Sequence, residues 1–165
     1  MDKYYYVVAQ LPMLFFDKET SLTSEAFLEE AGKWLSEGDF ALLSNCRYDM
    51  LDTGMKKPGL LRHYIEGEIL FRRELAMWRK MRKEGQDYKP ESFPVSLVKE
   101  GNPLTIEKAL LKRRWDSIET LETDHHFDLE FLILYFFKLQ ILEKLSLFDR
   151  QKGLELFQNL SKVDL

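Results

Sequence analysis

The stretch DLEFLILYFFKLQILEKLSLF, residues 128–148, decides the fold class of this chain. Within it, every residue from Phe131 to Phe137 is apolar, so a helix formed here has no polar face to turn toward water. Such a helix is stable when other helices cover it from several sides, as in a bundle. The apolar run is also far too short to cross a bilayer, so it predicts a buried helix and not a membrane span.

Helical spacing extends through most of the remaining chain. Thr23 is a good N-cap for the helical pattern that follows it, and Ser36 begins a second, shorter pattern. The longest pattern covers residues 60–84 and stops at Gly85, a residue that suits a helix end. A further pattern covers residues 104–123. The sequence therefore predicts an all-α fold.

A connector interrupts these patterns at residues 85–103. It contains three prolines and the short β-like piece PVSLV, residues 94–98. A strand there needs a neighbour to satisfy its backbone groups, and the chain offers few candidates. We predict a single domain over residues 1–165, a compact helical bundle that leaves room for one short strand pair.

The opening run YYYVVAQLPMLFF, residues 4–16, is ambiguous. Tyrosine and valine favour strands, whereas a helix would place Tyr4, Val7, Val8 and Leu11 on one face, with Pro12 limiting its length. We favour the helix and expect a buried first element whose rings pack on later helices.

Composition narrows the function classes. The formal net charge of −4, from 24 basic and 28 acidic side chains, gives no bulk electrostatic attraction to nucleic acid. The single cysteine, Cys46, cannot form an internal disulfide, which fits a reducing, intracellular setting. The opening run is broken by Gln10 and Pro12 and lacks a cleavage site, so it predicts neither a signal peptide nor a membrane span. We expect a soluble, cytoplasmic protein.

Catalytic motifs are absent from the sequence. It contains no nucleophile elbow, P-loop, zinc-binding helix motif or dinucleotide fingerprint. The glutamates Glu66, Glu68 and Glu74 lie in a helical pattern, where a solvated helix face explains them. His125 and His126 are adjacent and would diverge on a helix, whereas Asp128 fits an N-cap. We therefore predict a non-enzyme with no metal, cofactor or small-molecule substrate. A metal-dependent enzyme built on these two histidines and this aspartate is the weakest alternative.

Two surfaces are candidates for binding other proteins. The run FRRELAMWRKMRK, residues 71–83, gathers cations at the end of the longest helical pattern, where Arg79, Arg82 and Lys83 suit an acidic partner. Phe15 and Phe16 end the opening run with more apolar surface than a small bundle needs. Aromatic side chains contribute strongly to interface energetics, so both surfaces predict protein partners.

Two segments resemble the central-stalk subunit of V-type ATPases, called C in archaea and d in eukaryotes. The first combines YYYVVAQLPML with LTSEAFLEEAGKWLSEGDFALL, and the second is HHFDLEFLILYFFKLQIL. In the second, Asp128 and Leu129 match an Asp-Leu-x-Asn helix, Phe131 replaces the asparagine, and Lys138 takes the basic position. The resemblance covers the first 45 and the last 40 residues. The chain also resembles an uncharacterised bacterial family encoded beside V-type ATPase genes.

The resemblance implies a non-enzymatic adaptor that couples the rotor ring of a V-type ATPase to its central stalk. Its partners would be protein subunits of that enzyme, and it would be cytoplasmic but held near the inner membrane through them. The alternative is an independent helical module that uses its basic helix on an acidic partner.

Overall fold

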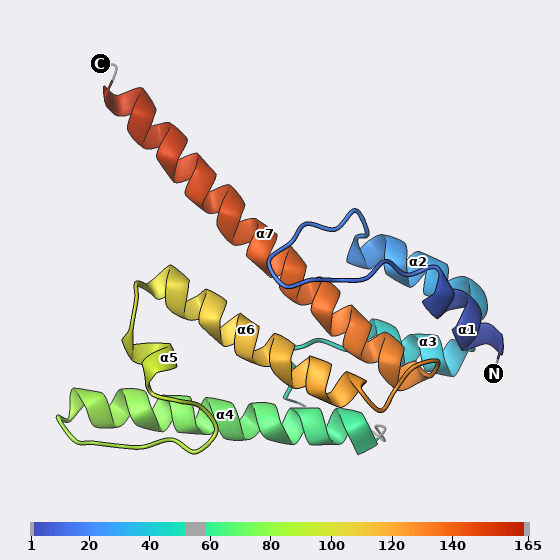
Figure 1. The fold of residues 1–165 in the computed structure, drawn as a ribbon, viewed down its shortest axis with the longest axis horizontal. Coiled ribbons are helices and arrows are strands. Elements are labelled where there is room, and N and C mark those ends of the chain that lie inside the picture. Colours follow the sequence, from blue (N-terminus) through green and yellow to red (C-terminus); the bar gives the residue numbers. More distant parts are fainter. Residues whose placement is uncertain (1, 52–58, 164–165) are drawn as a thin grey trace. The chain divides into compact units, whose positions relative to one another are not determined.

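The computed structural model describes residues 2–51 and 59–163. Within these ranges the chain forms helices and no strand, so the predicted all-α fold is confirmed (Figure 1). None of these helices is both long and apolar enough to span a membrane. The helices are α1 (Asp2–Ala9), α2 (Ser24–Trp34), α3 (Glu37–Ser44), α4 (Gly59–Lys83), α5 (Ser96–Lys99), α6 (Pro103–Glu122) and α7 (Leu129–Val163).

The prediction of a strand at residues 94–98 is wrong. Most of this piece lies in the short helix α5, and the amides of Leu97 and Val98 donate to the carbonyls of Pro94 and Val95. A helical turn satisfies these backbone groups locally, whereas a strand would need a partner that the described residues do not supply.

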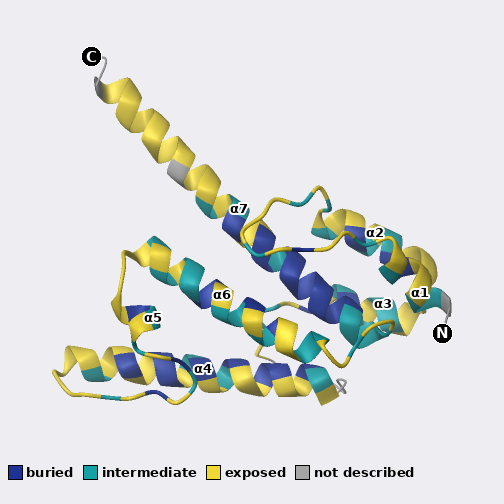
Figure 2. Cartoon of the chain, viewed as in Figure 1, coloured by how far each residue is buried: buried dark blue, intermediate teal, exposed yellow. Residues whose placement is uncertain are grey.

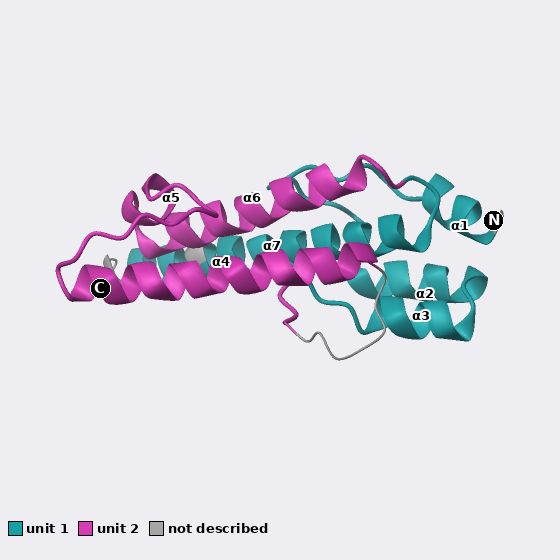
Figure 3. Cartoon of the chain, turned by 90° about the horizontal axis from the view of Figure 1, so that it is seen from below, with its two compact units in different colours: residues 1–48, 126–165 teal, residues 49–125 magenta. Residues whose placement is uncertain are grey.

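Contacts group the chain into two compact units (Figure 3). Unit 1 comprises residues 1–48 and 126–165, and unit 2 comprises residues 49–125. The predicted connector at 85–103 lies inside unit 2. The organisation of the chain as a single domain stays a prediction.

In unit 1, the buried part of α7 forms the centre of the packing. Helices α2 and α3 contact α7, and α1 contacts α2. Residues 132–137 of the predicted apolar run are buried and Phe131 is half-buried, and the buried stretch continues through Lys138 and Leu139 (Figure 2). The ring of Phe27 in α2 lies 5.5 Å from that of Tyr135 and 5.6 Å from that of Phe136, measured between centroids. Asp128 caps this helix, because its Oδ1 accepts a hydrogen bond of 2.8 Å from the amide of Phe131.

The opening run begins with a helix, as we favoured, and α1 ends at Ala9. Val7 is fully buried, and the Tyr4 hydroxyl donates to Oδ2 of Asp39 over 2.7 Å. The expectation of a buried first element is wrong for Tyr5 and Tyr6, which are 54% and 49% exposed. A helix of this length turns only one narrow face inward, so neighbouring tyrosines cannot all be buried.

Unit 2 has its own apolar core, built from α4, the connector, α5 and α6. Its buried members are Phe71, Leu75, Trp78, Phe93, Val98 and Leu110. Gly85 ends α4 as predicted, with a positive φ of 71° that glycine adopts without strain. The amide of Gln86 then donates to the carbonyl of Met81 over 2.9 Å, which closes the helix end.

Candidate protein-binding site

Arg79, Arg82 and Lys83, predicted to bind a partner, lie around one hollow in unit 2. The hollow has a volume of about 530 Å³ and is called the basic hollow below. Its lining consists of these three cations and three apolar side chains, Trp78, Val98 and Ile106.

The helix geometry of α4 explains why these cations share a surface. Arg79, Arg82 and Lys83 are three and four residues apart, so their side chains lie on one face of the last turns. All three are exposed, and the free carbonyls at this helix end favour positive charge. Two side chains of the lining, Trp78 and Val98, belong to the unit 2 core.

The basic hollow carries uncompensated positive charge. Among the described residues, no carboxylate forms an ion pair with Arg79, Arg82 or Lys83. The guanidinium of Arg82 lies over the ring of Trp78, 5.1 Å from its centroid, which holds this cation above the apolar floor. A cationic rim around an apolar floor suits an acidic segment with an apolar anchor.

Two buried carboxylates of α4 form hydrogen bonds to the other segments of unit 2. The carboxylate of Glu74 in α4 accepts hydrogen bonds from the amides of Glu91 and Ser92, at 3.1 and 2.7 Å, and from the Ser92 hydroxyl. The Ser92 hydroxyl is the main reason why the pKa of Glu74 lies below its usual value. These bonds fix the connector to α4 next to the core.

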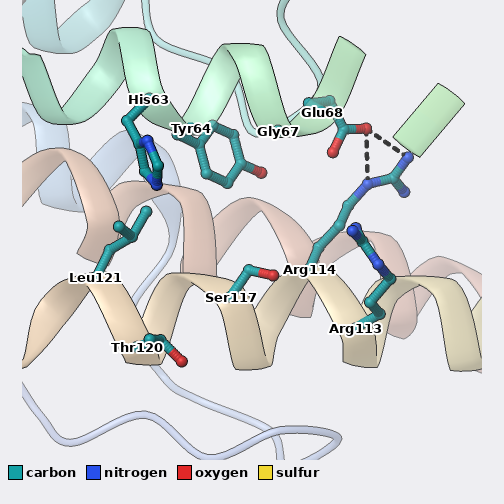
Figure 4. A pocket seen from close by; sticks show the side chains of 9 residues that line it. All are labelled: His63, Tyr64, Gly67, Glu68, Arg113, Arg114, Ser117, Thr120 and Leu121. Atoms are coloured by element: carbon teal, nitrogen blue, oxygen red, sulfur yellow. Dashed lines mark hydrogen bonds and ion pairs between the residues drawn. The ribbon is translucent and has the colours of Figure 1, made fainter. Parts of the chain in front are cut away.

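Glu68 joins α4 to α6 (Figure 4). Its Oε1 accepts hydrogen bonds from Nη2 and Nε of Arg114, at 2.8 and 3.0 Å, and from Nε of Arg72 at 3.1 Å. The side chain of Glu68 is only 2% exposed, so this carboxylate depends on its two arginines for compensation.

The expectation that Glu68 and Glu74 lie on a solvated face is therefore wrong. Sequence reasoning missed this network because charged side chains are almost never buried unless they are paired, and the pairing crosses from one helix to another. The position of Glu68 relative to apolar residues of the same helix is the signal that could have revealed its burial. Glu68 is four residues after buried Tyr64 and three before buried Phe71, on the inner face of α4.

Phe15 and Phe16 do not belong to this site. They follow α1 in unit 1, where Phe15 is 52% exposed and Nζ of Lys18 lies 5.1 Å from its ring centroid. Phe16 is half-buried. The structure thus assigns the predicted partner-binding residues to two surfaces on different units.

Two of the candidate metal ligands, His125 and Asp128, come together with Glu130: one ligand atom of each lies within 4.8 Å of the others. His125 ends unit 2, and its amide donates to the carbonyl of Glu122 over 3.0 Å. His126 and Asp128 belong to unit 1, where Asp128 caps α7.

Comparison with known proteins matches part of the chain to a family of unknown function. Residues 87–163 fit the profile of a family described as "Protein of unknown function (DUF2764)". No curated protein and no solved structure matches the chain. The matched region includes the connector, α5, α6 and α7, but not α1 or the cations of α4.

Proposed function

We propose that this protein is a non-enzymatic adaptor that binds subunits of a V-type rotary ATPase and couples its rotor ring to its central stalk. The observation that supports this proposal concerns unit 1. The two segments that resemble the central-stalk subunit are the first 45 and the last 40 residues, far apart in the sequence. Both segments fall within the same compact unit, so the residues that carry the resemblance belong to one structural unit.

Unit 1 has the internal links that a torque-bearing body needs. The amide of Ser24 donates to Oε1 of Glu143 over 2.8 Å. The side chain of Gln140 accepts from the amide of Tyr48 and donates to the carbonyl of Cys46, both over 3.0 Å. These bonds join the N-terminal part of unit 1, residues 1–48, to α7, and tight packing around them resists deformation.

Co-purification tests the proposal directly. The tagged full chain is purified from native membranes in mild detergent, and its companions are identified by mass spectrometry. We expect rotor and stalk subunits of the V-type ATPase in constant proportion. Reproducible absence of the protein from the intact complex would overturn the proposal.

A matched pair of variants locates the contact on unit 1. Phe15→Ser removes an exposed aromatic side chain from the predicted binding surface, and Met13→Ser removes a side chain that is 78% exposed nearby. We expect Phe15→Ser to reduce recovery of the ATPase subunits and Met13→Ser to leave it unchanged, because aromatic anchors dominate interface energies.

The basic hollow supports a second candidate function, a regulatory module that captures an acidic partner. Its three cations have no acidic partner among the described residues, so they remain available to one. Charge reversal of Arg79, Arg82 and Lys83 to Glu should abolish capture of a synthetic acidic amphipathic helix, with an unchanged melting temperature. Reversal of Arg62 and Arg73, two exposed cations elsewhere on α4, is the control. Equal capture by both variants would dismiss this function.

A further inference from the structure

A second pocket lies in unit 2 between α4 and α6 (Figure 4). It has a volume of about 250 Å³ and is called the α4–α6 pocket below. Several hydrogen-bond donors line this pocket. The lining residues are His63, Tyr64, Gly67, Glu68, Arg113, Arg114, Ser117, Thr120 and Leu121.

Three of these donors have unused capacity. Nε and Nη2 of Arg113 donate to the carbonyl of Ser92 over long distances of 3.4 and 3.3 Å, and Nη1 has no acceptor among the described residues. The side chains of His63 and Ser117 likewise have no hydrogen-bond partner within the described part of the chain. Figure 4 shows His63 directed from α4 toward α6 and Arg113 directed from α6 toward α4.

An aromatic ring supports the side chain of Arg113. Its guanidinium lies 3.9 Å from the ring centroid of Phe71, a fully buried core residue. This cation–π contact favours a guanidinium held close to the core.

The charges around the pocket do not balance. Among the charged side chains that line it, Glu68 is negative and Arg113 and Arg114 are positive, which leaves one positive charge in excess. Glu68 is already engaged by Arg72 and Arg114. Burial lowers the pKa of Arg113, because the loss of water disfavours its charged form.

We propose that the α4–α6 pocket binds a small phosphate dianion, either inorganic phosphate or the phosphate group of a small monoester. A tetrahedral oxyanion presents acceptor oxygens in several directions, which suits donors that come from two facing helices. A carboxylate would satisfy one edge of the Arg113 guanidinium but leave fewer acceptors for Ser117. The excess positive charge further favours an anion over a neutral ligand. This inference is independent of the adaptor proposal.

Calorimetric titration of the full chain tests the proposal. The probes are inorganic phosphate and glycerol 3-phosphate, with chloride at equal ionic strength and glycerol as controls. We expect saturable binding of at least one phosphate probe and none of chloride or glycerol. Preference for glycerol 3-phosphate would identify a monoester site, and preference for inorganic phosphate would identify a site for the free ion.

Two variants assign the binding to this pocket. Arg113→Gln should weaken phosphate binding by about tenfold or more, because hydrogen bonds to charged groups are among the stronger ones. Arg79→Gln makes the same charge change at the basic hollow and should alter binding by less than about twofold, since exposed charges are screened by salt.

Ser117→Ala removes a single donor without touching the Glu68 network, and we expect a loss of about threefold to tenfold in affinity. This variant keeps the test decisive if Arg113→Gln unfolds. The proposal is overturned if no phosphate probe binds, if Arg79→Gln weakens binding as much as Arg113→Gln, or if Ser117→Ala has no effect.

Discussion

Asp39 shows how one side chain links two helices of unit 1. Its Oδ2 accepts hydrogen bonds from the Tyr4 hydroxyl at 2.7 Å and from Nζ of Lys3 at 3.0 Å. The Tyr4 hydroxyl is the main reason why the pKa of Asp39 lies below its usual value. The first and third helices are joined by this polar contact at the edge of the unit.

Removing the Tyr4 hydroxyl should therefore have two effects. We expect Tyr4→Phe to lower the free energy of unfolding by about 1 kcal/mol, the usual net contribution of a hydrogen bond. It should also raise the pKa of Asp39, which carboxyl NMR titration measures. Tyr5→Phe is the control, because the Tyr5 hydroxyl makes no hydrogen bond within the described residues. Equal effects of the two variants would contradict this interpretation.

Glu74 makes stability depend on pH. The pKa of Glu74 is lowered in the folded state. Its contribution to stability is therefore fully present above the usual pKa of 4.5 and is lost as the pH falls through the lower pKa of the folded state. We expect Glu74→Gln to cost about 2 kcal/mol at neutral pH, because an amide cannot accept all three hydrogen bonds with one oxygen.

Urea unfolding at several pH values checks this expectation. The difference in unfolding free energy between wild type and Glu74→Gln should be constant from about pH 6 to about pH 8 and should shrink below about pH 4. The control is Glu66→Gln, on the exposed face of the same helix. A difference that grows in acid would refute the proposed role of the carboxylate.

At the level of helices, Glu68 is the main polar link between α4 and α6. Glu68→Gln removes the negative charge that pairs with Arg114, whose side chain is only 13% exposed. We expect a loss of about 3 kcal/mol in unfolding free energy, typical when one partner of a buried pair is removed.

A double variant separates the stability that the ion pair contributes from the cost of leaving a buried charge uncompensated. Glu68→Met combined with Arg114→Met removes both charges, and we expect it to be more stable than Glu68→Gln, because no buried charge is left uncompensated. Circular dichroism during urea unfolding measures the unfolding free energies of the single and the double variant. A double variant that is less stable than Glu68→Gln would show that the ion pair itself contributes the stability.

Helix α7 changes character along its length. Its described side chains from Asp149 onward are exposed, including Leu154, Leu156, Phe157 and Leu160 (Figure 2). A chain that stops after Phe148 should keep its melting temperature to within about 3 °C, because the removed part buries little apolar surface. Thermal unfolding of the truncated and full chains measures this, and a larger loss would mean that the exposed half stabilises the fold.

For the whole molecule, the two compact units make separate opening events measurable. Cys46 is the single thiol and is 1% exposed in unit 1, so its reaction with a thiol reagent requires that unit to open. Tyr4→Phe, also in unit 1, should accelerate labelling about fivefold, the factor that corresponds to 1 kcal/mol.

Glu74→Gln is the matched variant in unit 2. Because contacts divide the chain into two units, we expect it to change the labelling rate of Cys46 by less than about twofold. A similar acceleration by both variants would show that the units open together.

The sequence was most informative where the physics is local. Thr23 accepts a hydrogen bond from the amide of Ala26, and Ser36 accepts one from that of Asp39, as expected for N-caps. Gly85 and Asp128 mark helix ends where predicted. The sequence predicted that Arg79, Arg82 and Lys83 gather at the end of one helix, although it gave no sign of the hollow beside them.

The sequence by itself therefore determined the all-α class, the long helices and their ends, because caps, helix stops and apolar periodicity act between residues a few positions apart. Only the tertiary structure decided that residues 94–98 are helical, that Glu68 and Glu74 are buried, and that Val98 and Ile106 lie beneath the cations of α4. Each of these depends on which distant segment supplies a hydrogen bond, a counter-charge or an apolar neighbour. Folding brings such partners together from distant parts of the sequence, and no local sequence pattern identifies them.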